Sequence, residues 1–97
     1  MSTTFTLSRP ITHGSEEITE LEFREPTTKD VNALGMPFKL NADLISEPIP
    51  AITAKYISRL AGIPPSVVDK IDVIDYMQLL YLVMGFFTRS TDAQQKN

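Results

Sequence analysis

The chain contains no cysteine, a single histidine and only four glycines, and each scarcity argues against a class of function. Without cysteine there can be neither disulfides nor thiolate metal sites, and His13 alone leaves zinc without a plausible ligand set. His13 stands beside Gly14 in a turn, where a histidine is normally a solvated residue. The few glycines form no phosphate-cradling loop and no nucleophile elbow. The sequence therefore predicts a protein that is not an enzyme and holds no metal or cofactor.

Runs of basic residues and long apolar segments are also missing. The nine lysines and arginines are scattered and the net charge is −3, so no stretch would follow a phosphate backbone. The longest apolar run, 79–87, is far shorter than the ~18 residues of a membrane span. The first residues lack the basic start and apolar core of a signal peptide. We expect a soluble cytoplasmic protein with neither nucleic acid nor membrane as partner.

The length and the patterning predict one α+β domain, with an N-terminal β-hairpin packed against three or four short helices. We expect the domain to span residues 1–87, followed by a polar disordered tail at 88–97. Within the domain we expect the hairpin at 1–26, a short helix and a proline-containing loop at 27–50, and further helices at 51–87.

Alternation of apolar and polar residues predicts the hairpin. Ile18 is out of phase with Leu21 and Phe23, which indicates a bulge or a late strand start there. The glutamates of the second strand form its solvent face, which protects a sheet edge from aggregation. Glu25 and Arg24 are expected to fix the corner between the hairpin and the next helix.

Capping residues and helical periodicity predict the helices that follow. Thr27 and Asp30 begin the first helix, and a helical turn could form at 42–46 within the loop. A helix from Ala51 ends at Gly62, and a short helix is expected at 67–71. Asp72, reinforced by Asp75, caps the last helix.

The last helix, 72–87, is apolar nearly all round, whereas a surface helix has an apolar face little more than ~100° wide. Asp75 and Gln78 form its one polar stripe, which continues as Leu82 and Gly85. One face belongs to the core, but a hairpin and a short helix cannot cover the rest. We therefore expect a second contact, either a self-association surface or a groove for another polypeptide. The candidate protein-binding residues are Tyr56, Leu60, Tyr76, Leu79, Leu80, Val83, Phe86 and Phe87. Methionines 77 and 84 would suit a permissive surface of this kind.

An alternative interpretation is a helix-turn-helix regulator, because residues 56–68 contain two helical segments separated by Gly62. The second helix would present Ser66, Asp69 and Lys70 to DNA. This set of residues interacts poorly with the negative charge of the DNA phosphates, so a plain helical corner is the better interpretation.

Three stretches of the sequence resemble the tail assembly chaperones of contractile-tailed, Mu-like phages and prophages. They are LEFREPT at 21–27 followed by Asp30-Val31, LAGIPP at 60–65, and Ile71-Asp72 with Asp75 and the closing Gly85-Phe86-Phe87. The resemblance extends from Thr4 to Phe87. Residues 36–50 match no pattern of the family, so the resemblance implies nothing about them.

The resemblance implies a role in virion morphogenesis in the host cell cytoplasm. Such chaperones are thought to bind the tape measure protein and keep it soluble until tail tube subunits polymerise around it. Further candidate partners are the tail tube protein, a frameshifted longer form of the chain and a second copy in a homo-oligomer. The family supplies no catalytic or ligand residues. A small structural tail protein, of the tube or connector, is the alternative.

Overall fold

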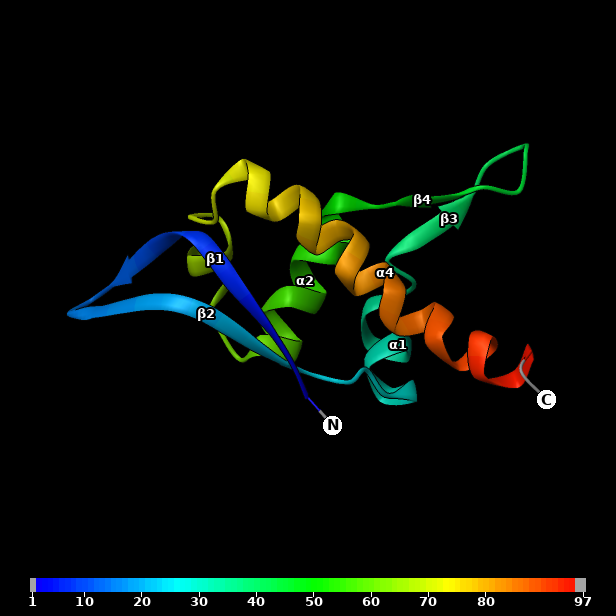
Figure 1. Ribbon diagram of the computed structural model, residues 1–97, viewed down its shortest axis with the longest axis horizontal. Helices are drawn as coiled ribbons and strands as arrows, with labels where there is room; N and C mark the ends of the chain where they lie inside the picture. The colour runs from blue at the N-terminus through cyan, green and yellow to red at the C-terminus, as the bar shows by residue number, and fades with distance from the viewer. Residues whose placement is uncertain (1, 96–97) are drawn as a thin grey trace.

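Eight elements follow one another in the computed structural model, which describes residues 2–95 and the side chains of residues 2–88. Their order combines a long hairpin, four helices and a second, small hairpin, as Figure 1 shows. The elements are β1 (Ser2–His13), β2 (Glu16–Arg24), α1 (Thr28–Leu34), β3 (Phe38–Leu40), β4 (Ser46–Pro48), α2 (Pro50–Ala61), α3 (Pro65–Val68) and α4 (Val73–Gln95). The expected α+β fold with an N-terminal hairpin is confirmed.

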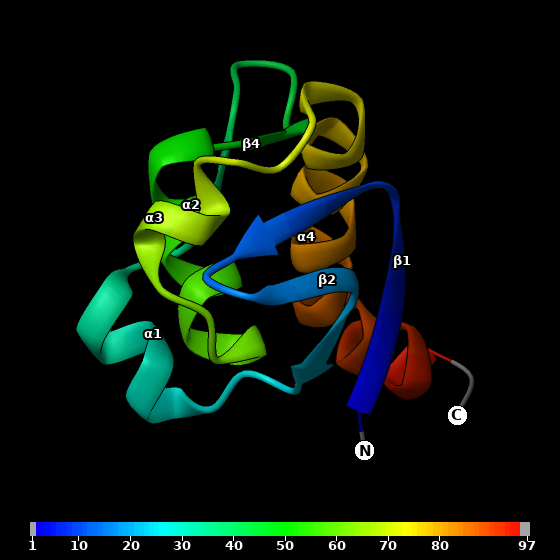
Figure 2. The same ribbon diagram turned by 90° about the vertical axis from the view of Figure 1, so that its left-hand side faces the viewer.

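The hairpin of β1 and β2 crosses one side of the helical layer (Figure 2). β2 packs on α2, whereas β1 contacts α4. Its inward face carries Leu7, Leu21 and Phe23, which are buried, while its outward face carries exposed threonines and glutamates. This alternation is what a half-buried two-stranded sheet requires.

The irregularity of this hairpin lies on β1 and not at Ile18. Ile18 pairs with Ile11, and the register shifts between Thr6 and Ile11, where β1 contains the extra residues. Pro10 lies inside this bulge, where its missing amide breaks no ladder hydrogen bond. The out-of-phase pattern at Ile18 thus indicates a bulge, as expected, but the bulge lies on β1 and not on β2.

Residues 36–50 form a small hairpin, and the expected helical turn at 42–46 is wrong. The side-chain oxygen of Asn41 accepts hydrogen bonds from the amides of Asp43 and Ile45, at 2.8 and 3.0 Å. This Asx-type turn competes with helix and reverses the chain between β3 and β4. Leu44 adopts a left-handed conformation, φ 64°, at the tip of the turn, where its side chain is 77% exposed.

The helices begin close to the positions that their capping residues predict. Thr27 and Asp30 form a capping box on α1, and Gly62 ends α2 in the left-handed conformation. The short helix α3 ends at Val68 and not at Ile71. The last helix runs past its expected end at residue 87 and continues to Gln95, since residues 88–95 contain neither glycine nor proline. The expected disordered tail is thus helical to Gln95, and residues 96–97 lie outside the described residues.

The hydrophobic core lies where the hairpin, α2, α3 and one face of α4 meet. Phe23, Tyr56, Leu79 and Val83 are fully enclosed at its centre. Each large apolar side chain buried in this way contributes roughly 1.5–3 kcal/mol. The burial of both aromatic and aliphatic residues fixes which face of α4 points inward.

Candidate functional site

The last helix, α4, has one buried face and one exposed face, and both are apolar. Leu79 and Val83 are fully buried and Phe86 is 8% exposed, against the hairpin and α2. On the opposite side, Val73, Ile74, Met77 and Tyr81 are between 53% and 65% exposed. On a surface helix of a monomeric protein, the side that faces solvent normally carries polar residues. The expectation that this fold cannot enclose the whole helix is thus met, because a contiguous apolar strip remains in water.

The exposed residues follow the spacing of a helix-packing seam. Ile74, Met77, Tyr81 and Met84 are separated by three, four and three residues, the repeat of positions that face a partner in coiled coils. We call these four residues the α4 seam. Met84 is half-buried, and the other three are exposed. Gln78 and Gly85 lie along the seam and are also exposed.

Most of the residues predicted as a protein-binding surface lie in the core instead. Of the eight, Tyr56, Leu60, Leu79, Val83 and Phe86 are buried, and Tyr76, Leu80 and Phe87 are half-buried. A partner could reach the five buried residues only if the domain opened. The sequence singled out a helix that the fold leaves partly exposed, but it could not reveal which of its two apolar faces the rest of the chain covers.

Ring contacts show that Phe86 and Phe87, the last two of the predicted protein-binding residues, hold the fold together. Phe86 packs on Phe23 with ring centroids 6.2 Å apart. Phe87 contacts Tyr56 edge-on at 5.6 Å and Phe38 at 6.1 Å, which ties α4 to α2 and to β3. Such pairs add ~0.5–1.5 kcal/mol beyond their area. The Tyr56 hydroxyl donates to the Gly35 carbonyl at 2.6 Å, and burial raises the pKa of this phenol.

The polar stripe expected on α4 is divided, because Gln78 faces water and Asp75 does not. Asp75 is 2% exposed, and its carboxylate accepts hydrogen bonds from the backbone amides of Ser8 and Arg9 in the bulge of β1. Asp72 caps the helix as expected, since its carboxylate accepts the amide of Ile74 at 3.1 Å. Asp75 therefore fastens the hairpin to α4, a role that no local sequence pattern reveals.

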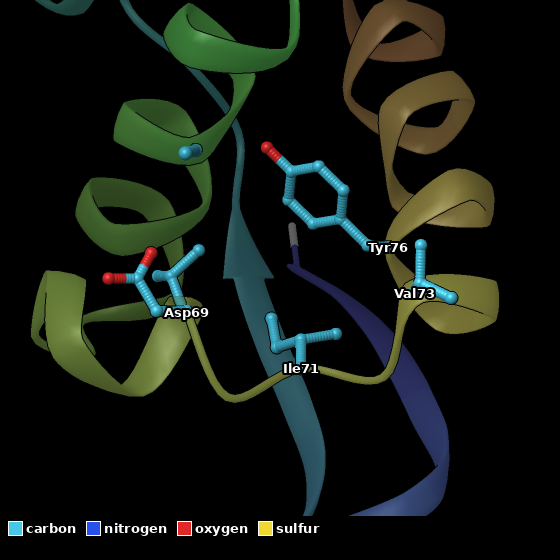
Figure 3. Close-up of a pocket in the computed structure, with 6 residues that line it drawn as sticks. Asp69, Ile71, Val73 and Tyr76 are labelled. Atoms are coloured by element: carbon cyan, nitrogen blue, oxygen red, sulfur yellow. The ribbon is translucent and has the colours of Figure 1, made fainter.

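A pocket of about 300 Å³ opens beside the first turn of α4 (Figure 3). It lies between α2, α3 and α4, and its lining residues are Ala54, Val68, Asp69, Ile71, Val73 and Tyr76. The Tyr76 side chain extends from α4 across the space toward α2, and its hydroxyl donates to the Pro50 carbonyl at 2.8 Å. Burial raises the pKa of this phenol. Val73 lines the pocket and lies one helical turn before Met77 of the seam, so the pocket adjoins the seam.

The strongest electrostatic cluster holds a corner of the fold. Asp30, 1% exposed, accepts a bidentate pair from Arg24 at 2.8 and 3.0 Å and a third bond from Arg59 at 2.6 Å. The Thr27 amide and hydroxyl donate to the same carboxylate. The Arg24 guanidinium, with these other donors, outweighs burial and holds the pKa of Asp30 well below its usual range. The expectation that Arg24 fixes the hairpin-to-helix corner is confirmed, and Arg59 of α2 joins the same cluster.

The corner between α2 and α3 is poorly suited to recognise DNA. α3 contains four residues, and Val67 and Val68, half of them, are buried. A recognition helix needs several exposed side chains along a groove. The plain helical corner is therefore the interpretation that the geometry supports.

Fold and surface together define a small α+β protein in which one apolar face of the last helix is exposed to solvent. The chain belongs to the family of phage tail assembly chaperone proteins, E, or 41 or 14, whose family model matches residues 4–88. The comparisons with curated proteins and with solved structures gave no match. The family resemblance is thereby confirmed at the level of tail assembly chaperones. Among the helices within residues 2–95, none has the length and hydropathy that a membrane crossing demands.

Proposed function

We propose that this chaperone holds apolar helical segments of the phage tape measure protein in solution during tail assembly in the host cell. The observation that carries the proposal is the exposed α4 seam. Ile74, Met77 and Tyr81 are each more than half exposed on a helix whose other face is fully packed. Exposed apolar strips of this size mark contact surfaces in soluble proteins.

The chemistry of the seam suits a client that varies in sequence. Methionine has an unbranched, polarizable side chain that adapts its shape to different neighbours. Tyr81 adds a large contact area, and a tyrosine loses little conformational entropy when it becomes ordered. A tape measure helix would offer many similar apolar segments, so a permissive surface serves better than a closely shaped pocket.

Co-expression of the chaperone with the tape measure protein of the same phage tests the proposal. The measurement is the fraction of tape measure protein that stays soluble after centrifugation. Wild type should keep it in solution, and the double variant Met77→Lys/Tyr81→Lys should lose most of this effect. Both positions are exposed, so the variant should fold normally.

Thr4→Lys/Thr6→Lys is the matched control, since it adds the same two charges on the outward face of β1. It should behave as wild type. Equal solubility with the seam variant would show that the client binds elsewhere. A tape measure protein that is no more soluble with wild type than without it would refute the function itself.

A further inference from the structure

Gly85 lies in the middle of α4, where no contact with the described residues requires a glycine. A Cβ atom built there would meet no heavy atom within 4 Å, and the residue is exposed. In contrast to the glycines at 14, 35 and 62, Gly85 has no positive φ that would favour this residue type. A glycine inside a helix is less stable than alanine by about 1 kcal/mol. The fold of the described residues therefore gives no reason for this residue.

The position of Gly85 supplies a reason from outside the fold. It follows Met84 directly and stands one helical turn beyond Tyr81, beside the α4 seam. Small residues at such positions let two helix backbones approach closely. We propose that Gly85 forms a notch that receives the backbone of a client α-helix, which packs along the α4 seam. This inference rests on the proposed function, because the client helix belongs to the tape measure protein.

The charges of this face define the client segment. From Val73 to Thr88, the exposed positions of α4 carry no formal charge: they are Val73, Ile74, Met77, Gln78, Tyr81, Gly85 and Thr88. Asp75 is buried on the opposite side, and Asp72 lies at the end of the helix. A charged group placed against the seam would lose hydration without gaining a partner. The matching client strip is therefore apolar and uncharged over about four turns.

The available area favours a client over a second copy of this chain. The four most exposed apolar residues of α4 are 53–65% exposed. They offer on the order of 400 Å², if a large side chain contributes about 150–250 Å². A stable protein pair buries about 800 Å² on each partner. Two domains joined only through their seams would thus form a weak dimer. A long client helix can instead be covered by several copies, each of which is readily displaced.

Substitutions at Gly85 separate binding from stability. Gly85→Ala should raise the Tm of the isolated chain by about 4–8 °C, because it removes the helix penalty of glycine. The same variant should bind a purified tape measure segment about tenfold more weakly, since a methyl group would fill the notch. Gly85→Leu should weaken binding further. Binding is measured by calorimetry with full-length chaperone, and folding by circular dichroism.

Leu44→Gly is the control for stability, because it relaxes a strained residue far from α4 in the sequence. It should raise the Tm without changing the affinity. If both Gly85 variants bind the segment as tightly as wild type, the notch is refuted and the proposed function stands. If the wild-type protein does not bind the segment, both the notch and the proposed function are refuted. If the variants abolish a dimer seen in sedimentation while client binding persists, the occupant is a second copy and the inference is wrong.

Discussion

The carboxylate of Asp75 in α4 accepts the backbone amide of Ser8 at 3.0 Å, across 67 residues of sequence. The bond joins the bulge of β1 to the first turn of the last helix. The same rotation of α4 that brings Asp75 to the hairpin points Leu79 and Val83 into the core, while Met77 and Tyr81 point to solvent. The Asp75 bond and the packing of the core therefore support the same exposure of the α4 seam.

Asp75→Ala should destabilise the domain by about 2 kcal/mol, because the amides of Ser8 and Arg9 lose a charged acceptor. Urea unfolding followed by circular dichroism measures the change. Asp72→Asn is the control: it keeps a capping oxygen but removes an ion pair with Arg9, whose side chain is 80% exposed, and a negative charge at the helix N-terminus. Its effect should stay within about 1 kcal/mol. Equal losses from both variants would contradict the role given to Asp75.

Acid should weaken the fold through Asp30. Its pKa is lowered in the folded state relative to about 3.9 in an unfolded chain, so its stabilising contribution is complete above about pH 5. Below that pH the unfolded state binds more protons, and the contribution is lost progressively. Tm is measured for wild type and Asp30→Asn from pH 2 to pH 7. Wild type should have the higher Tm at neutral pH, and the difference between the two Tm values should narrow in acid. A gap that is constant with pH would disprove the linkage.

Phe86→Ala should destabilise the chain by about 3–5 kcal/mol, the range for a large aromatic removed from a packed core. Its ring is 8% exposed and packs on Phe23. Tyr81→Ala, on the exposed face of the same helix, should change stability by less than about 1 kcal/mol. Chemical denaturation of both variants checks the contrast. Similar losses would mean that the faces of α4 are assigned incorrectly.

Leu44→Gly should stabilise the chain by about 1 kcal/mol. Leu44 has φ 64°, a conformation that strains residues with a Cβ atom. Its side chain is 77% exposed, so little packing is lost. Ile45→Gly is the comparison, since Ile45 has no positive φ and should lose stability instead. Thermal unfolding distinguishes the two, and a loss in both variants would show that the turn carries no such strain.

The sequence predicted those parts of the fold that local chemistry determines. Thr27, Asp30 and Gly62 predicted helix ends correctly, because caps act through neighbouring amides. The small hairpin at 38–48 escaped prediction: the local signal of its turn, Asn41, was missed, and its packing of Phe38 against Phe87 is a tertiary contact. Tertiary contacts of this kind override short-range propensity.

The candidate site was predicted only as a helix, not as a face. Leu79 and Tyr81 are equally acceptable in a core, and their opposite environments depend on Asp75 and the β1 bulge. The three–four–three spacing from Ile74 to Met84 was the available signal. It could not be separated from the equally apolar set that contains Leu79, Val83 and Phe86.

Methyl NMR of methionine tests most directly the claim that the α4 seam holds the client. The chain carries Met77 and Met84 on the seam, whereas Met36 is 40% exposed between α1 and β3 and serves as an internal reference. On titration with a tape measure segment, the ¹³C-methyl signals of Met77 and Met84 should shift together, while that of Met36 stays in place. Binding that shifts Met36 and leaves Met77 and Met84 unmoved would contradict the account.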